Sequence, residues 1–174
     1  MQKYIKTNRL EISAMVKRDL PDLNSLLSSL KLRELSGLQM PVDDTNRMLA
    51  LTLLAGDEFI FVIRLITTGE LIGLIGFYKC YQPDFSVSTG FRELGYLLAE
   101  NMWGNGYMTE VGDKLINEFF KDTNYKYLCA GIMPNNHRSQ RVLTKLKFVQ
   151  SLQPDELTSD QFGPKELYFQ RTAE

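Results

Sequence analysis

The chain has 174 residues, of which 44% are hydrophobic and 24% charged, and its formal net charge is −1. These values are typical of a single globular domain, here residues 1–174, and they exclude the basic surface that nucleic acid or an anionic membrane requires. No apolar run approaches the ~18 residues of a membrane span, and the N-terminal segment lacks the apolar core of a signal peptide. The sequence therefore predicts a cytoplasmic protein with no nucleic-acid or membrane partner.

Metal and disulfide chemistry have few residues to draw on. The chain contains one histidine and two cysteines, Cys80 and Cys129. Each cysteine stands in an apolar, strand-like run, which favours two buried, reduced thiols. Ligands of this kind are too few and too scattered for a structural zinc site, so we expect no metal.

In chain order, the sequence predicts a mixed α/β domain of the α+β type. Runs rich in β-branched and aromatic residues predict seven strands, and apolar residues at helical spacing predict four helices. The segment 82–90 is expected to be a polar loop, and Gly73 and Gly76 predict a close backbone approach or a bulge. The strands are expected at 9–16, 58–66, 71–81, 92–99, 126–133, 148–152 and 165–171, and the helices at 21–35, 41–56, 105–121 and 136–146.

The order of these elements indicates a mixed, mostly antiparallel, twisted sheet of six or seven strands, flanked by about four helices. Three consecutive strands in the middle of the chain are expected to pair antiparallel. The helix at 105–121 connects the strands at 92–99 and 126–133, and a crossover of this kind makes those two strands parallel neighbours.

A glycine-bearing turn, Trp103-Gly104-Asn105-Gly106, precedes the helix at 105–121. Because Tyr107 follows Gly106, the turn fails the P-loop pattern, and because Thr109 replaces the third glycine, it fails the dinucleotide fingerprint. Two readings remain: a tight turn without a ligand, which the turn alone favours, or a pyrophosphate site built from backbone N–H groups at a helix N-terminus. The helix carries one apolar stripe, formed by Met108, Val111, Leu115 and Phe119.

A second motif follows one strand later. The pattern N-x-x-S-x-x-V-L-x-K-L-x-F runs from Asn136 to Phe148, after W-G-x-G-Y-x-T-E at 103–110. The motifs T-x-R-L at 7–10 and E-L-G-Y at 93–96 accompany them. Together they resemble the GNAT superfamily of acyl-CoA-dependent N-acyltransferases, and most closely its branch of ribosomal-protein alanine N-acetyltransferases (Rim-type).

This resemblance implies a single GNAT domain in which the sheet splays between its two parallel strands, with acetyl-CoA as co-substrate. The turn and helix start would hold the coenzyme A pyrophosphate, and the strand end would pair with the pantetheine amides and offer a main-chain N–H to the thioester carbonyl. Asn136 would hydrogen-bond the pantetheine arm, and Ser139 would assist departure of the thiolate. The other implied binding residues are Leu97, Leu98, Ala99, Trp103, Gly104, Asn105, Gly106, Tyr107, Met108 and Thr109.

The sequence departs from the family pattern at three positions. The family often has Gln or Arg where Trp103 stands, and it prefers a small residue where Met108 stands. It usually has Gly where Lys147 stands, just past the end of a helix. A left-handed helix cap is expected there, at a cost of about 1 kcal/mol for a residue other than glycine.

The acceptor would be a primary amine that attacks the thioester directly. An α-amino group, with a pKa of about 7.7–8.0, is partly neutral near pH 7, whereas lysine, at about 10.4, is almost fully protonated. An α-amine therefore needs only a modest base. Glu93 is the first candidate for it, with a strand-edge ion pair as the alternative reading. Glu100, Asp155 and Glu156 are weaker candidates.

Other polar residues near the motifs have two readings each. His137 is expected to be exposed at a helix start rather than catalytic. Tyr96 and Tyr107 are expected to pack, although either could border the acyl pocket. Arg138, Arg141 and Lys145 form either a solvated helix face or a contact with the adenosine phosphates.

The resemblance places the acceptor among three loops, 35–44, 82–90 and 153–164. Their acids suit a cationic amine, such as a protein N-terminus or a small molecule. An acyl-CoA-binding or sensing module without activity and a plain interaction domain are the rival functions, and either a monomer or a homodimer is compatible with the sequence. The acids are Asp43, Asp44, Asp84, Asp155, Glu156 and Asp160.

Overall fold

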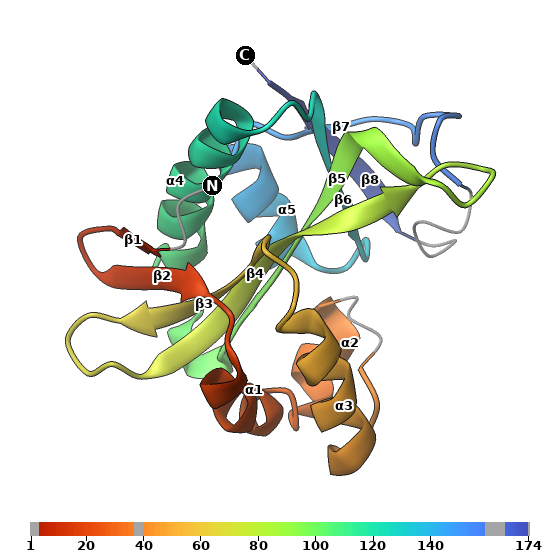
Figure 1. Ribbon diagram of the computed structural model, residues 1–174. Coiled ribbons are helices and arrows are strands. Elements are labelled where there is room, and N and C mark those ends of the chain that lie inside the picture. The colour runs from red at the N-terminus through yellow and green to blue at the C-terminus, as the bar shows by residue number, and fades with distance from the viewer. Residues whose placement is uncertain (1–3, 37–39, 159–165, 174) are drawn as a thin grey trace.

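The computed structural model describes residues 4–36, 40–158 and 166–173. Within them, eight strands form one sheet in the order β1-β2-β3-β4-β5-β6-β8-β7, and five α-helices flank it (Figure 1). The strands are β1 (Tyr4–Lys6), β2 (Leu10–Ala14), β3 (Ile60–Leu65), β4 (Leu71–Tyr81), β5 (Val87–Leu98), β6 (Tyr127–Ile132), β7 (Val149–Gln150) and β8 (Leu167–Thr172). The helices are α1 (Leu20–Leu26), α2 (Leu30–Ser36), α3 (Asp44–Leu54), α4 (Tyr107–Asp122) and α5 (His137–Lys145).

The sheet is antiparallel except at one place. β5 and β6 are parallel, as the crossover predicted, and every other neighbouring pair is antiparallel. The parallel contact joins only Phe91 to Tyr127, Arg92 to Leu128 and Glu93 to Cys129. Beyond these pairs the two strands part, so the sheet is split in its middle.

Helices cover both faces of the sheet (Figure 1). The predicted apolar stripe of α4 is buried on one face, where it packs with α5 and with β-strand side chains such as Phe77. On the other face, Leu23 of α1 and Leu51 of α3 pack against Val62 and Leu97. Each face of the sheet therefore has its own apolar core. Among the described residues, none of the helices is long and apolar enough to cross a membrane.

The structure differs from the predicted elements in three places. β1 was not predicted, because three residues are too few to show alternation. The predicted helix at 21–35 is divided into α1 and α2, since the Ser28 hydroxyl bonds the carbonyl of Ser25 (2.7 Å) and Ser29 caps α2 through Leu32 N–H (3.3 Å). Part of the loop expected at 82–90 is strand, because β5 begins at Val87, where a register shift restores pairing with Tyr81.

Glycines allow the close approach of β4 to its neighbours, as predicted. A Cβ at Gly73 would lie 2.4 Å from the carbonyl oxygen of Leu97, and one at Gly76 would lie 2.4 Å from Ile60 Cδ1. The register shift lies in the pairing of β3 with β4, between Ile63 and Arg64. The backbone of β5 is thus set tightly against Gly73.

The end of α5 has the expected left-handed cap. Lys147 has φ 64°. Phe148 N–H donates to the Leu143 carbonyl (3.0 Å) and Lys147 N–H donates to the Thr144 carbonyl (3.1 Å), which is the Schellman pattern. A buried arginine, Arg171, donates to the remaining carbonyl of Leu146 (3.0 Å). These bonds terminate α5 despite the absence of glycine.

The two cysteines are both buried and free, as predicted. Their sulfur atoms lie 3.5 Å apart, and Cys129 Sγ also lies 3.4 Å from the carbonyl oxygen of Arg92. Burial raises the pKa of the Cys129 thiol, and the hydrogen bond with Cys80 raises it further. Both groups therefore act as small apolar side chains under the junction of β5 and β6.

Replacing Gly73 with alanine should lower the free energy of unfolding by about 1–3 kcal/mol, because the new Cβ would press on backbone that cannot yield as a side chain can. Gly90→Ala is the matched control, since its Cβ would meet nothing within 4 Å. Urea denaturation of both variants measures the difference. Equal stabilities would show that β5 can move away from β4 at no cost.

Candidate functional site

A cavity of about 290 Å³ opens where β5 and β6 part. Its walls are the end of β5, the turn before α4, the first turn of α4, one side of α5 along its length, and the apolar side of α2. The predicted binding residues line it, with the exception of Ala99 and Asn105. Those lining it are Leu97, Leu98, Trp103, Gly104, Gly106, Tyr107, Met108, Thr109, Asn136 and Ser139.

The turn before α4 depends on its two glycines. Gly104 and Gly106 have φ of 79° and 77°, a region that other residues adopt only with strain. Gly106 is the N-cap of α4 and has no side chain with which to cap it. The first N–H groups of the helix, at Tyr107, Met108 and Thr109, have no carbonyl within the helix to bond. The helix dipole and these N–H groups favour an anion at this wall of the cavity.

The end of β5 exposes backbone groups on one side only. Ala99 N–H donates to the Ile72 carbonyl of β4 (2.8 Å), so it is not available to a ligand. Because the N–H and C=O groups of successive residues alternate in direction, those of Leu98 point away from β4. Trp103 Nε1 donates to the Leu98 carbonyl (2.8 Å). The N–H of Leu98 is therefore directed toward the side on which β6 has left the sheet.

Asn105 builds the turn rather than the cavity wall. Its side-chain amide donates to the carbonyls of Met102 (3.1 Å) and Trp103 (3.2 Å). Arg9, from before β2, donates to the Asn105 carbonyl (3.0 Å). Sequence reasoning linked neither Arg9 nor Met102 to the site, because no local pattern connects residue 9 with residue 105.

Asn136 is the N-cap of α5. Its Oδ1 accepts from Ser139 N–H (3.2 Å), and its Nδ2 donates to the carbonyl of Leu35 in α2 (3.0 Å). Both ends of the side chain therefore have partners within the protein, and the bond to Leu35 joins α2 to α5 across the cavity. Ser139 lines the cavity, and its side chain forms a hydrogen bond with the Tyr96 phenol.

Tyr96 closes the inner end of the cavity. Its hydroxyl donates to the Ser139 carbonyl (3.3 Å), and its ring packs against the core beneath α4. Burial raises the pKa of Tyr96, so the phenol stays protonated at neutral pH. Tyr96 and Tyr107 both pack, as expected, and both also line the cavity.

The charged residues on the cavity wall are all basic. Arg138, Arg141 and Lys145 stand at successive turns of α5, and none of the described lining residues is acidic. Arg138 Cζ and Lys31 Nζ each lie 5.0 Å from the centre of the Trp103 ring. Arg138, Arg141 and Lys145 are exposed to solvent and also line the cavity.

Leu32 and Leu35 of α2 complete the wall. Sequence reasoning did not assign Leu32 to the site, and it placed Leu35 only at the start of an acceptor loop. Nearby, Ser29 and Lys31 contact the carboxylate of Glu100 at 3.0 Å and 2.6 Å. The hydrogen bond from Lys31, and then that from Ser29, lowers the pKa of Glu100, and this anchored carboxylate is a poor base.

Glu93 lies outside this cavity. Along β5, Leu94 and Leu98 belong to the core beneath α4, whereas Leu97 belongs to the core beneath α1 and α3. By alternation, Glu93 faces the same side as Leu97. Its neighbour across the strands is Tyr78 of β4, whose hydroxyl is buried without a partner among the described residues. Burial, and then the charges of Glu93 and Asp57, raise the pKa of Tyr78.

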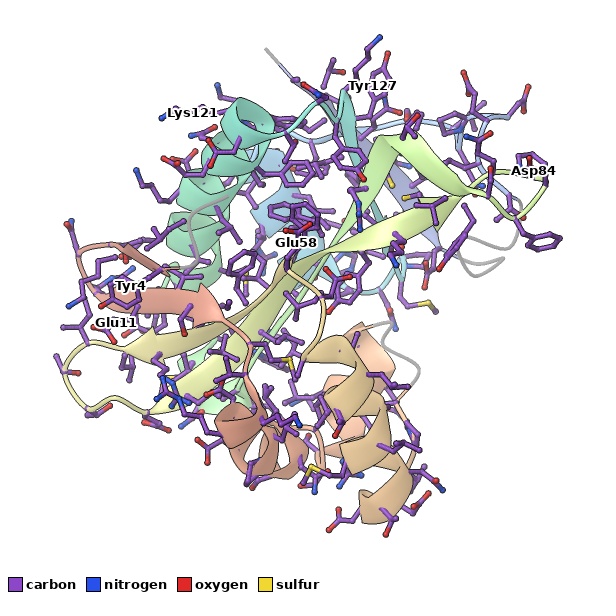
Figure 2. All side chains as sticks on the ribbon, in the orientation of Figure 1. Tyr4, Glu11, Glu58, Asp84, Lys121 and Tyr127 are labelled. Carbon is purple, nitrogen blue, oxygen red and sulfur yellow. The ribbon has the colours of Figure 1, made fainter. Side chains whose placement is uncertain are left out.

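The predicted acceptor loops are described only in part. Asp160 lies outside the described residues, as do 37–39 and 159–164 of these loops. Asp155 and Glu156 are exposed, and His137 is exposed at the first position of α5, as expected. Asp84 lies at the tip of the hairpin joining β4 and β5, well away from the helices (Figure 2).

Comparison with known sequences identifies the motifs. The family described as "Acetyltransferase (GNAT) domain" matches residues 9–149. The uncharacterized N-acetyltransferase p20 of Bacillus licheniformis is 35% identical over 95 residues, which are 55% of this chain and 51% of that protein. The chain therefore spans about half the length of the curated relatives it matches.

Comparison with solved structures identifies the fold. An acetyltransferase of the GNAT family from Bacillus anthracis is 19% identical, with a TM-score of 0.78 over 98% of both chains. The ribosomal-protein-S5-alanine acetyltransferase from Vibrio fischeri is 16% identical, with a TM-score of 0.72 over 99% of this chain and 98% of that one. An aminoglycoside acetyltransferase in complex with coenzyme A is 20% identical, with a TM-score of 0.66 over 94% of both chains. These likenesses confirm the predicted α/β architecture.

Replacing Asn136 with alanine should lower the free energy of unfolding by about 1–2 kcal/mol without any ligand, because it removes both the cap of α5 and the bond to α2. Asn136→Asp keeps a capping oxygen and should lose less. The exposed neighbour Asn135 supplies the control, Asn135→Ala. Chemical denaturation of the three variants would disprove the capping role if all had the same midpoint.

Proposed function

We propose, since this chain belongs to the GNAT acetyltransferase family, that residues 1–174 act as one domain that moves an acetyl group from acetyl-CoA to a primary amine. One observation carries the proposal. The glycine turn before α4 and the N-x-x-S motif at the start of α5 line a single cavity at the parting of β5 and β6. Acetyl-CoA supplies an activated thioester that a neutral amine can attack directly.

The residues of the cavity fit coenzyme A. The first N–H groups of α4 would bind the pyrophosphate, and Arg138, Arg141 and Lys145 would offset the charge of the phosphates. The Leu98 N–H would pair with the pantetheine or stabilise negative charge on the thioester oxygen. Asn136 would bond the pantetheine amides through its second Nδ2 hydrogen, because the Leu35 carbonyl accepts only one of the two.

Ser139 would act on the departing thiol. Ser139 lines the cavity, and its side chain forms a hydrogen bond with the phenol of Tyr96. A thiol with a pKa of about 8.5 leaves without strong acid catalysis, so a hydrogen bond or a water-relayed proton suffices. Tyr96, which stays protonated, would border the acyl end of the cavity and hold the start of α5 through the Ser139 carbonyl.

The amine would approach from the opposite face of β5, where Glu93 lies. Glu93 would remove the proton of the amine directly or through water, and the neighbouring acids would attract a cation. Relatives in fold include both a ribosomal-protein alanine acetyltransferase and an aminoglycoside acetyltransferase. The acceptor is accordingly proposed as a primary amine, either a protein N-terminal α-amine or an amine of a small molecule.

The function is tested by thiol release from acetyl-CoA in the presence of a panel of N-terminal peptides and small amines. Acetyl-CoA should bind in calorimetry, and at least one amine should release thiol. Ser139→Ala should lower kcat by about tenfold or more while leaving the Kd for acetyl-CoA unchanged, and Ser28→Ala in the α1–α2 turn should change neither. Binding without thiol release from any amine would favour the sensing module, and absence of binding would refute the proposal.

The role of Glu93 is tested by the pH profile of kcat/KM for the best amine. Glu93→Gln should lower kcat/KM about 100-fold at pH 7. The loss should narrow toward pH 9, since an α-amine with a pKa of about 7.7–8.0 is then neutral without help. Glu118→Gln, in the C-terminal half of α4 where Glu118 pairs with Lys114 and does not line the cavity, should behave as wild type. An unchanged profile in Glu93→Gln would exclude Glu93 as the base.

A further inference from the structure

Arg9, the arginine of the T-x-R-L motif, is bound to the first turn of α4. Its Nε and Nη2 lie 2.8 Å and 2.7 Å from Glu110 Oε2, and its backbone N–H donates to Glu110 Oε1 (3.2 Å). Its Nη1 donates to the Asn105 carbonyl (3.0 Å), and its guanidinium lies 4.4 Å from the centre of the Tyr107 ring. Contacts between α4 and β2 hold the two segments together (Figure 1). Arg9 therefore clamps the turn that precedes α4 from outside the cavity.

The partner of Arg9 creates an electrostatic problem for an anion at this turn. Glu110 follows the three residues whose N–H groups face the cavity, and its own N–H donates to Gly106 (3.0 Å). Partial burial raises the pKa of Glu110, but hydrogen bonds from Thr7 and Arg9 outweigh burial and keep the pKa below its usual range. The carboxylate is thus charged at neutral pH. Unless it is neutralised, a carboxylate within one helical turn repels a phosphate at the helix start.

We propose that Arg9 is a positioning residue for coenzyme A, which it serves by holding the Asn105–Gly106 turn in place and by cancelling the charge of Glu110. The proposal rests on the proposed function, because it assumes that this turn receives the pyrophosphate. The T-x-R-L motif would thus contribute the residue that holds the turn and cancels the charge of Glu110, a role that neither the glycine turn nor the N-x-x-S motif has.

The contacts of Arg9 distinguish positioning from direct binding. Each of the three guanidinium nitrogens already has a protein partner, and Arg9 does not line the cavity. A direct phosphate ligand would need a guanidinium that faces the cavity. The guanidinium instead contacts Glu110 Oε2 through two of its nitrogens and lies over the Tyr107 ring, an arrangement that lysine cannot reproduce.

The experiment measures the Kd for coenzyme A by titration calorimetry in four forms of the full chain: wild type, Arg9→Ala, Glu110→Gln and the double variant. Arg9→Ala should weaken binding about tenfold, because a free Glu110 charge and a loosened turn act together. Glu110→Gln should bind as well as wild type or up to about threefold more tightly, since it frees a cation near the phosphates. The double variant should return to within about threefold of wild type.

The recovery in the double variant separates charge cancellation from a merely structural role. The double variant loses more contacts than Arg9→Ala, so the melting temperature of the double variant should not recover. If the role of Arg9 were purely structural, the double variant would bind coenzyme A more weakly than Arg9→Ala. Glu110→Gln retains the Arg9 bond to Asn105 and keeps the test informative if Arg9→Ala folds poorly. Weaker binding in Glu110→Gln, or unchanged binding in Arg9→Ala, would overturn the proposal.

Lys6→Ala is the matched control. It removes another ion pair of the N-terminal strands, Lys6 with Glu11 (2.9 Å), at a site where Tyr4 and Glu11 lie together on β1 and β2 (Figure 2). Its Kd for coenzyme A should equal that of wild type, and a tenfold loss here would mean that any damage to these strands weakens binding. Failure of the wild-type chain to bind coenzyme A would refute the proposed function and this inference together, whereas normal wild-type binding with no effect of Arg9→Ala would refute the inference alone.

Discussion

The separation of β5 from β6 is the constraint on which the rest of the structure depends. Backbone N–H and C=O groups inside a sheet need partners, and a buried one without a partner costs about 1–3 kcal/mol. After Glu93, β5 loses its neighbour on one side. The indole of Trp103 takes the Leu98 carbonyl, and the first turns of α4 and α5 close around the gap. A ligand with amide groups of its own can complete the pairing that β6 leaves unmade.

The same strand divides the chemistry between two faces. Alternation of side chains places Tyr96 on the side of α4 and α5, with Ser139, and it places Glu93 on the side of α1 and α3. In the proposed reaction, Ser139 would therefore assist the leaving thiol from one face of β5, and Glu93 would act on the attacking amine from the other face. The glycine turn and the basic side of α5 would hold the cofactor at one face only, which leaves the other face free for an acceptor.

Connections between distant segments hold this site in shape. Asn136 ties α5 to α2 through the Leu35 carbonyl, and Arg9 ties the N-terminal strands to α4. Gly73 lets the end of β5 lie close against β4. The geometry of the cavity therefore depends on contacts between segments that lie far apart in the sequence.

The sequence by itself determined most of the element types, the parallel pair and the two motifs at the start of α4 and α5. It could do so because these features depend on residues close together in the sequence. Gly104 and Gly106 occupy positions with positive φ, and Asn136 caps the start of α5. The spacing of apolar residues shows which face of a helix is buried. Only the tertiary structure decided that Glu93 lies on the other face from Ser139, that Leu35 shares the side chain of Asn136, and that Arg9 neutralises Glu110 from 101 residues away. Such contacts follow from how the whole sheet packs, and no spacing within a segment encodes them.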